Sequence, residues 1–389
     1  MQKPQPTEGY KYDEEKREVA KQYENTKLAL DTANGTLVPA AFCLILLLSG
    51  ASSQLARLLS SICGSYWFSL WAYLVVFVVI LQLVTLPLGY YSGFVVDHRF
   101  HLSTQTIRGW AVDELKGLGL EIVFGLIAGT ALYYLIEITS LWWIAAAAIF
   151  AVFSIILSII LPFLILPIFY KVNPLSDAKL NEDLIQMTKR AGVGNIDRVL
   201  VADESRRSIR ANAFFSGVGK SKSIVLFDTL LDNFTLREIV TVVAHELGHY
   251  VNKDIWMEAL TSGLLIIPPF FVAQLALKLA VGTSILTNLI DPAGIPLIFA
   301  VLTAINFVFQ PVSNAISRTV ETRADEFALK IARDPEAQAS TERRLADLAL
   351  GVDKPTRLVE VLFYTHPPPS KRIRLAEEWN SRARAQVQP

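Results

Sequence analysis

The chain alternates between long apolar blocks and polar segments. No charged residue occurs in five blocks, which lie between Asp31 and Arg57, Arg57 and Asp97, Glu137 and Lys171, Glu258 and Lys278, and Asp291 and Arg318. A helix needs about 20 apolar residues to cross the hydrocarbon core of a bilayer. The pattern therefore predicts about six membrane-spanning helices, over residues 36–55, 67–90, 118–138, 141–168, 257–277 and 294–314.

The spans divide the chain into five regions. We expect a polar N-terminal tail over 1–35, four spans within 36–170, a polar domain over 171–254, two spans within 255–314 and a polar C-terminal part over 315–389. The fold class predicted is predominantly α: a polytopic transmembrane bundle or barrel with a polar domain that contains a small β-sheet.

The polar domain shows helix and strand patterns. A helix is expected over Ser176–Ala191, capped by Ser176. Three short strands follow, at Ile196–Ala202, Ala211–Ser216 and Ser223–Phe227, with Gly217 and Gly219 in a turn between the last two.

Composition and charge narrow the class of protein. Apolar residues make up 52% of the chain and charged residues 19%, with a mean hydropathy of +0.39, which is too apolar for an ordinary soluble domain. Lys+Arg and Asp+Glu are both 36, so no basic surface for nucleic acid is expected. The two cysteines, Cys43 and Cys63, lie in or beside the first apolar block and suit neither a metal knuckle nor a disulfide framework.

The distribution of Lys and Arg orients the chain in the membrane. Six precede the first span, twelve lie in the segment 171–254 and thirteen follow Asn314, whereas the first loop has only Arg57, the third loop has none and the fifth loop has only Lys278 at its start. Basic residues accumulate on the cytosolic side. Both termini and both large polar parts are therefore predicted to face the cytosol, in a bacterial inner membrane or the endoplasmic reticulum.

The stretch VTVVAHELGHYVNKD carries the candidate chemistry. On a helix that begins near Thr235, with Glu238 completing a capping box, His245 and His249 lie one turn apart on one face and can bind one zinc ion. Glu246 can accept a proton from a water molecule that the zinc activates. The HExxH pattern is the signature of zinc metalloproteases. Gly248 would let another element approach this helix closely. The alternative is that the two histidines only pack in a core or an interface.

A catalytic zinc site needs a third protein ligand. The best candidate is Glu321 in NAISRTVETRADEFALKIA, on a helix predicted to continue out of the last span over Asn314–Arg333. Asp325, one turn further, would accept a hydrogen bond from a ligand histidine. Without the upstream motif, this segment would be an ordinary amphipathic helix with solvated charges.

These residues carry a family resemblance. HELGH, then SRTVETRAD, then THPPPSKRI resemble the type I CAAX prenyl proteases, which are membrane-embedded zinc metalloproteases related to bacterial heat-shock membrane proteases. The segments YYSGFVVDHRFHLSTQT, LPIFYKVNPL, NAFFSG and SIVLFDTLL are similar to that family as well, so the likeness covers about residues 65–385.

The resemblance implies roles for individual residues. His245, His249 and Glu321 would bind one zinc ion in a gluzincin-like domain, and Glu246 would be the general base. Asn212 would contact the substrate main chain from an edge strand, together with Ala213 and Phe214. His366 and Arg372 would lie near the substrate and stabilise the oxyanion. It also implies a helical barrel that encloses a chamber in the membrane, with the zinc near its cytosolic end.

The expected function is that of an integral-membrane zinc metalloendopeptidase that removes the last three residues of prenylated CAAX proteins. Its partners would be a peptide or prenylated protein and the lipid bilayer. Two alternatives remain open. One is a quality-control protease for membrane proteins that acts without prenylation, and the other is a channel or transporter, although few charged residues lie within the spans.

Overall fold

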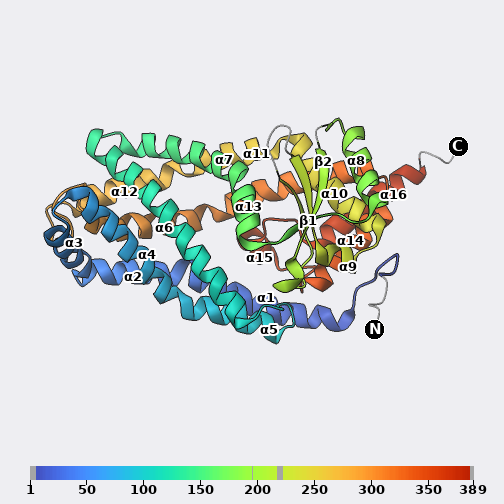
Figure 1. Ribbon diagram of the computed structural model, residues 1–389, viewed down its shortest axis with the longest axis horizontal. Coiled ribbons are helices and arrows are strands. Elements are labelled where there is room, and N and C mark those ends of the chain that lie inside the picture. The colour runs from blue at the N-terminus through green and yellow to red at the C-terminus, as the bar shows by residue number, and fades with distance from the viewer. Residues whose placement is uncertain (1–5, 195, 217–221, 386–389) are drawn as a thin grey trace.

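The computed structural model describes residues 6–194, 196–216 and 222–385. The molecule is elongated, with long helices at one end and a domain built around a small β-sheet at the other (Figure 1). The first and the last described segments of the chain both lie at the sheet-domain end. The predicted fold class, mostly helical with a small sheet, is confirmed.

The helical end forms the membrane part. Within the described ranges, five helical segments are long and apolar enough to cross a membrane, and each overlaps a predicted span: Glu14–Leu48, Tyr66–Arg99, Ile107–Ile138, Asp254–Ala280 and Pro292–Ala332. The remaining predicted span, 141–168, forms α7 (Trp142–Phe169), which contains a shorter apolar stretch at Trp142–Leu157.

The first helical segment differs from the prediction at both ends. Helix α1 (Glu14–Thr32) occupies most of the predicted polar tail and continues through a π-helical turn (Ala33–Leu37) into α2 (Val38–Leu48). Asp13 caps α1 by accepting hydrogen bonds from two main-chain nitrogens of its first turn. The predicted span 36–55 stops at residue 48 because Gly50 takes a left-handed φ of 73°. The separate helix α3 (Ala51–Cys63) follows.

The other long helices pack around buried aromatic side chains, among them Tyr73, Tyr133, Trp142 and Phe270. Helix α13 runs without a break from the membrane part into the sheet domain, which confirms the helix predicted over Asn314–Arg333. The bounds are α4 (Tyr66–Tyr90), a π-helical turn (Tyr91–Val96), α5 (Asp97–Arg99), α6 (Ile107–Ile138), α11 (Asp254–Leu265), α12 (Ile267–Ala280), a 3-10 turn (Pro292–Gly294) and α13 (Ile295–Ala332).

The sheet has four strands in the order β1-β2-β4-β3. Strands β2 and β4 are parallel, and β1 and β3 flank them in antiparallel orientation. The three predicted strands are present as β2 (Ile196–Ala202), β3 (Ala213–Ser216) and β4 (Lys222–Phe227), whereas β1 (Val172–Pro174) was not predicted. Gly217 and Gly219, predicted in the turn between β3 and β4, lie outside the described residues.

Helices cover the sheet and complete the domain. Helix α8 (Ala178–Arg190) is capped by Asp177, whose carboxylate accepts hydrogen bonds from the main-chain nitrogens of Lys179 and Leu180, and the predicted cap Ser176 lies one residue too early. The C-terminal part is helical on both sides of the segment FYTHPPPS, as predicted. The bounds are a 3-10 turn (Glu204–Arg206), α9 (Asp228–Asn233), α10 (Leu236–Asn252), α14 (Pro335–Leu348), α15 (Arg357–Phe363) and α16 (Pro369–Ala385).

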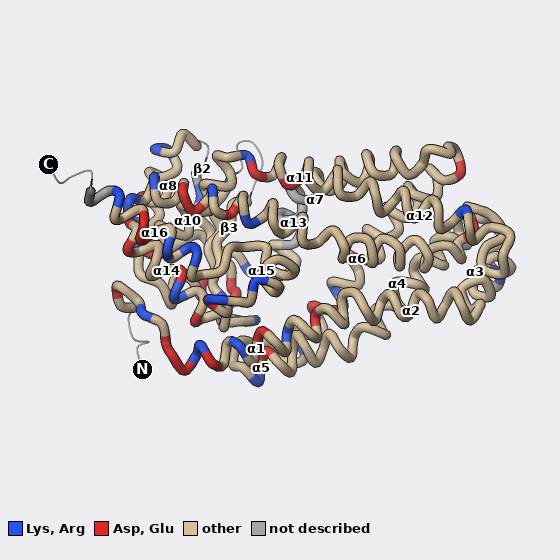
Figure 2. Tube along the Cα trace, turned by 180° about the vertical axis from the view of Figure 1, so that it is seen from behind, with Lys and Arg blue, Asp and Glu red and all other residues tan. Residues whose placement is uncertain are grey.

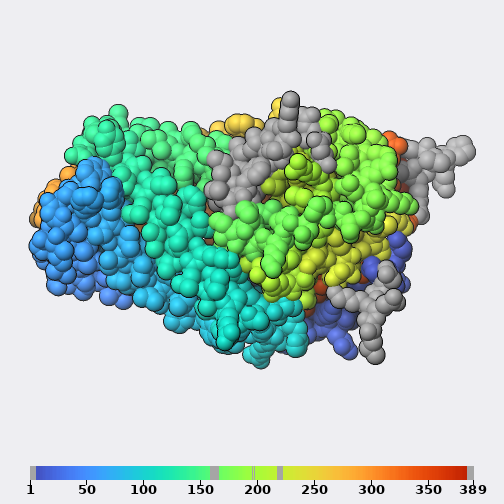
Figure 3. Space-filling model, in the orientation of Figure 1, coloured from blue at the N-terminus to red at the C-terminus, as the bar shows by residue number. Residues whose placement is uncertain are grey.

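The N-terminal segment packs against the C-terminal part of the chain. The main-chain nitrogen of Tyr10 donates to the hydroxyl of Ser340, and that of Asp13 to the carboxylate of Asp347. Buried Arg17 forms an ion pair with the same Asp347. Charged residues gather in the sheet domain and around α1 (Figure 2), whereas the N-terminal helices cover one face of the membrane part along its length (Figure 3).

Candidate active site

Helix α10 presents two histidines to one point. Its N-terminus has the predicted capping box, in which the Thr235 side chain accepts from the nitrogen of Glu238 and the Glu238 carboxylate accepts from the nitrogen of Thr235. One turn apart further along the helix, His245 and His249 bring their Nε2 atoms to 3.2 Å. The imidazole pair is therefore fixed by the rigid middle of a capped helix.

The third candidate ligand comes from α13. One carboxylate oxygen of Glu321 lies 3.1 Å from His245 Nε2, and the other lies 3.5 Å from His249 Nε2. The approach is close because Gly248 faces α13, where a Cβ on that glycine would lie 3.0 Å from the Cα of Ala324. This confirms the close approach predicted at Gly248.

Two carboxylates hold the other ring nitrogens of the histidines. His245 Nδ1 lies 2.8 Å from Asp325 Oδ1, as predicted, and His249 Nδ1 lies 2.9 Å from Asp254 Oδ2. A proton on each Nδ1 satisfies these contacts and leaves each Nε2 as an unprotonated lone pair. The two lone pairs and the Glu321 carboxylate then converge without a proton between them, which favours a cation at their centre.

The donor set fits zinc. Ligands at about 2.0–2.2 Å around a tetrahedral zinc ion stand roughly 3.3 Å apart, and the three ligand separations here are 3.1, 3.2 and 3.5 Å. Glu321 Oε2 is buried and has no hydrogen-bond partner among the described residues. A buried carboxylate oxygen without a partner is costly unless a cation binds it. His245, His249 and Glu321 thus suit a metal with three protein ligands and an open fourth position.

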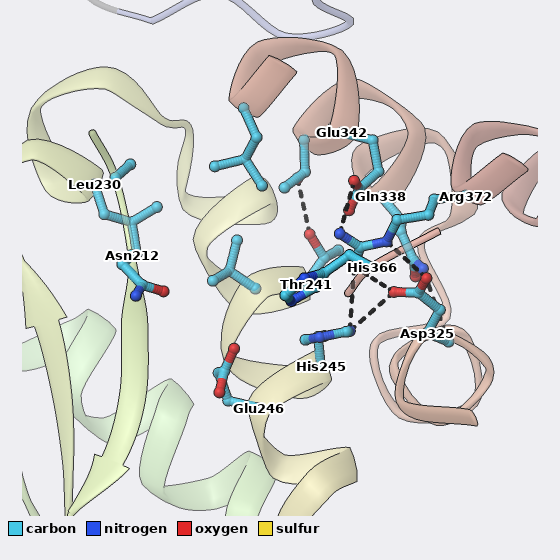
Figure 4. A pocket seen from close by; sticks show the side chains of 14 residues that line it. Asn212, Leu230, Thr241, His245, Glu246, Asp325, Gln338, Glu342, His366 and Arg372 are labelled. Carbon is cyan, nitrogen blue, oxygen red and sulfur yellow. Dashed lines mark hydrogen bonds and ion pairs between the residues drawn. The ribbon is translucent and has the colours of Figure 1, made fainter. Parts of the chain in front are cut away.

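Glu246 lies next to this cluster and faces the same cavity as His245 (Figure 4). Burial raises the pKa of its carboxyl above the ordinary value. A general base works best when its pKa approaches the working pH. The position and the direction of this shift suit the predicted role of Glu246 in proton transfer.

His366 and Arg372 also line the cavity, but they are held differently. His366 Nε2 lies 3.2 Å from Glu321 Oε1, and 58% of its side chain is exposed. Arg372 is almost buried, and its guanidinium binds both carboxylate oxygens of Asp325, at 2.7 and 2.5 Å, and one oxygen of Glu342, at 2.9 Å. The guanidinium is thus largely engaged by carboxylates, whereas the His366 ring is accessible.

The predicted substrate-binding residues lie at the start of β3. Asn212 lines the cavity opposite Glu246, and its Oδ1 accepts a hydrogen bond from the nitrogen of Ala213 (Figure 4). The side chain of Ala213 is buried in the core between the sheet and α10, and that of Phe214 packs on Phe227. Of the three predicted substrate-binding residues, Asn212 lines the cavity, whereas Ala213 and Phe214 lie outside its lining.

Two residues of the site were missed from the sequence. Asp254, which holds His249, begins α11 directly after Lys253 ends α10 in a left-handed conformation. The position of Asp254, five residues after His249, was the one feature of the sequence that could have indicated this contact. Glu342, which binds Arg372, sits in the charged segment TERRLAD, where nothing in the pattern distinguishes it from its neighbours.

Family models match both parts of the chain. Residues 174–380 match the model of peptidase family M48, and residues 2–171 match that of the CAAX prenyl protease N-terminal region, which is described as five membrane helices. The uncharacterized metalloprotease YhfN of Bacillus subtilis is 29% identical over 368 residues, which cover 92% of this chain and 85% of that protein.

A yeast relative and a solved structure extend the comparison. CAAX prenyl protease 1 of Saccharomyces cerevisiae is 31% identical over 319 residues, covering 75% of this chain and 68% of that protein. The crystal structure of S. mikatae Ste24p has the same fold, with a TM-score of 0.79 and 25% identity over 93% of this chain and 88% of that one. Both halves of the chain are therefore matched, and the chain belongs to the CAAX prenyl proteases of the M48 metalloprotease family.

Proposed function

We propose that this multi-pass membrane metalloprotease uses zinc to cleave prenylated proteins near their C-terminus, releasing the last three residues. The observation that carries the proposal is the convergence of His245, His249 and Glu321 beside Glu246 and the edge strand β3. The relative from Saccharomyces cerevisiae bears the name CAAX prenyl protease 1. The excess of Lys and Arg in the sheet domain supports a cytosolic position for the site.

The substrate peptide adds to the sheet as a further strand. Strand β3 is an edge strand, which pairs with β4 and with no other strand of the described residues. An extended peptide that pairs with the free edge of β3 is held by main-chain hydrogen bonds, which fix its register without reading its sequence. Asn212 at the start of β3 then holds the peptide near Glu246. The apolar helices offer a surface for the prenyl chain, which is buried by the hydrophobic effect.

The chain supplies the proton transfer itself. Zinc held by the three ligands would supply Lewis-acid polarisation of the scissile carbonyl and of the attacking water. The Glu246 carboxylate takes a proton from that water and donates it to the leaving nitrogen, so the peptide bond breaks into a carboxylate and an amine. Asp325 and Asp254 keep each ligand histidine in one tautomer and orientation throughout.

His366 and Arg372 have different roles in the proposed mechanism. The exposed His366 ring can donate to the oxyanion of the tetrahedral intermediate. Arg372 was expected to share that role, but its contacts to Asp325 and Glu342 favour a positioning role. By holding Asp325, Arg372 orients His245, whose Nδ1 is bound to the same carboxylate.

A matched pair of peptides tests the function. The purified protein in detergent is given a farnesylated CAAX peptide and the same peptide without the farnesyl group, and the released tripeptide is measured. We expect the farnesylated peptide to be cleaved and Glu246→Gln to lower turnover by about 10²–10⁴-fold while zinc stays bound. A chelator should stop cleavage, and added zinc should restore it.

The alternatives give different outcomes. Equal cleavage of both peptides would favour a quality-control protease, and undiminished cleavage by Glu246→Gln would remove the base from the mechanism. Asp183→Asn is a control, because Asp183 is exposed on α8 and makes no ion pair with a described residue.

A further inference from the structure

A second cavity lies at the end of the membrane part that is far from the sheet. Its volume is about 540 Å³, and it is enclosed by α3, the start of α4 and the loop between α12 and α13. From Ile295, beside this cavity, the unbroken helix α13 rises about 39 Å to Glu321. Since the bilayer core is about 30 Å thick, the cavity and the metal site belong to opposite faces of the membrane.

The cavity contains one basic side chain without a partner. Arg57 lines it, is exposed, and makes no ion pair or hydrogen bond with the described residues. The one acidic side chain in the lining, Asp291, is already occupied. Its Oδ2 accepts hydrogen bonds from the main-chain nitrogen and the hydroxyl of Thr287, at 3.1 and 2.8 Å, and its Oδ1 accepts from the nitrogen of Ala293 at 3.0 Å. Asp291 thus caps the 3-10 turn Pro292–Gly294 that precedes α13 and leaves Arg57 available.

Several hydroxyl groups in the lining are also unpaired. Ser53, Ser69 and Tyr66 donate to main-chain carbonyls. In contrast, the side chains of Ser60, Ser65 and Ser284 have no hydrogen-bond partner within the residues that the structure describes. One guanidinium and three free hydroxyls can together donate to a group with several anionic oxygens, and a phosphate is such a group.

The exposed apolar face of helix α3 indicates that the phosphate belongs to a lipid. The helix turns its small residues Ser52, Ser53 and Ala56 inward, whereas Leu58 is 55% exposed and Ile62 is 69% exposed. Large apolar side chains on the outer face are typical of a helix that lies in the membrane interface. Arg57, next to Leu58, is thereby placed at the depth of the lipid headgroups. On α4, Phe68 is also an exposed apolar side chain, at 59%.

We propose that this cavity binds the phosphate headgroup of an anionic phospholipid in the membrane leaflet opposite the metal site. Arg57 pairs with the phosphate, and Ser60, Ser65 and Ser284 donate hydrogen bonds to its oxygens. The acyl chains lie against the outer face of α3, over Leu58 and Ile62. The lipid site includes none of the proposed metal ligands and none of the cavity residues around Glu246. A test of lipid binding is therefore independent of the protease activity.

The test compares lipid binding by the full chain and two variants. Wild type, Arg57→Gln and Arg108→Gln are purified in a neutral detergent and titrated with phosphatidylglycerol, phosphatidylcholine or inorganic phosphate. Bound lipid is counted by native mass spectrometry, and thermal unfolding is followed by tryptophan fluorescence. Arg108 is the matched control, because it is exposed near the start of α6 and has no partner among the described residues.

We expect phosphatidylglycerol to bind wild type and Arg108→Gln equally and Arg57→Gln about tenfold more weakly, which is the loss of one hydrogen-bonded charged contact. Arg57→Lys, which keeps the charge, should retain part of the affinity. Without lipid, Arg57→Gln should melt at the wild-type temperature, which shows that its weaker binding is not unfolding. Equal binding by wild type and Arg57→Gln would overturn the site. Equal stabilisation by inorganic phosphate would overturn the assignment to a lipid. Equal binding of phosphatidylcholine, which has a phosphate but no net charge, would overturn the assignment to an anionic phospholipid.

Discussion

Gly248 and Ala324 bring two helices into main-chain contact at the centre of the site. A Cβ on Gly248 would lie 3.0 Å from the Cα and 3.1 Å from the carbonyl oxygen of Ala324. The two ligand histidines flank Gly248 in sequence, and Glu321 and Asp325 flank Ala324. The distance between α10 and α13 therefore fixes whether the short Glu321 side chain reaches both imidazoles.

Gly248→Ala should push these helices apart, because the atoms opposite are main chain and cannot rotate away. We expect a loss of about 1–3 kcal/mol of stability, typical of overpacking, together with weaker zinc binding. Thermal unfolding and chelator competition measure both. Gly117→Ala is the control, since a Cβ there meets nothing within 4 Å. If Gly248→Ala behaved like Gly117→Ala, the close contact would not set the ligand geometry.

Asp254 should matter for metal affinity although it is no ligand. Asp254→Asn keeps the size of the side chain but weakens the hold on His249 Nδ1, now 2.9 Å from the carboxylate. Loss of such a partner typically lowers metal affinity about 10–100-fold. Zinc affinity is measured by competition with a chromogenic chelator, with Asp183→Asn beside it. Unchanged affinity in Asp254→Asn would show that the helix alone orients His249.

Glu342 predicts a pH dependence of stability. Burial raises the pKa of this carboxyl to about 7, above its ordinary value near 4.5. The folded state therefore binds the proton of Glu342 more tightly than the unfolded state does. Protonation of Glu342 adds fully to the free energy of unfolding below about pH 4.5, and this stabilisation is lost as the pH rises through 7.

Glu342→Gln removes this titration. From pH 5 to pH 8, the melting temperature of the wild type should fall relative to that of Glu342→Gln. Both proteins are measured in the same detergent. Parallel curves over that range would show that Arg372, 2.9 Å away, keeps Glu342 ionised throughout.

The N-terminal helix should be essential for stability. Arg17 forms a buried ion pair with Asp347, whose side chain is 2% exposed, and donates to the carbonyl of Gly351 at 2.7 Å. Arg17→Ala would leave Asp347 buried without its cation, which typically costs about 3–5 kcal/mol. Lys11→Ala, at an exposed position, should unfold like the wild type. Equal melting temperatures for the two variants would mean that the N-terminal segment is only loosely attached.

The meeting of His245, His249 and Glu321 was predictable in part because helical spacing depends only on nearby residues. One helical turn separates His245 from His249, and one separates Glu321 from Asp325, so the spacing alone places each pair on one face. That the two pairs meet was inferred from chemistry, since a catalytic zinc site needs a third ligand. The spans were predictable for a similar reason, because the bilayer sets their length and composition.

The missed features depend on contacts between distant parts of the chain or on the path of a turn. Asp254 reaches His249 only because Lys253 adopts a positive φ of 57°, which reverses the chain. Arg17 and Asp347 are 330 residues apart, and Glu342 acquires its role only when α16 brings Arg372 to it. Strand β1, with three residues, carries too little pattern to be recognised.

The ligand set has a consequence for biosynthesis. A ribosome that has finished α10 has produced two of the three metal ligands, and α11 and α12 must still be translated and inserted before α13 delivers the third. Arg372 emerges later still. A nascent chain that lacks α13 therefore lacks the complete proposed ligand set, so three protein ligands can meet around one metal ion only after the last membrane-spanning helix has been synthesised.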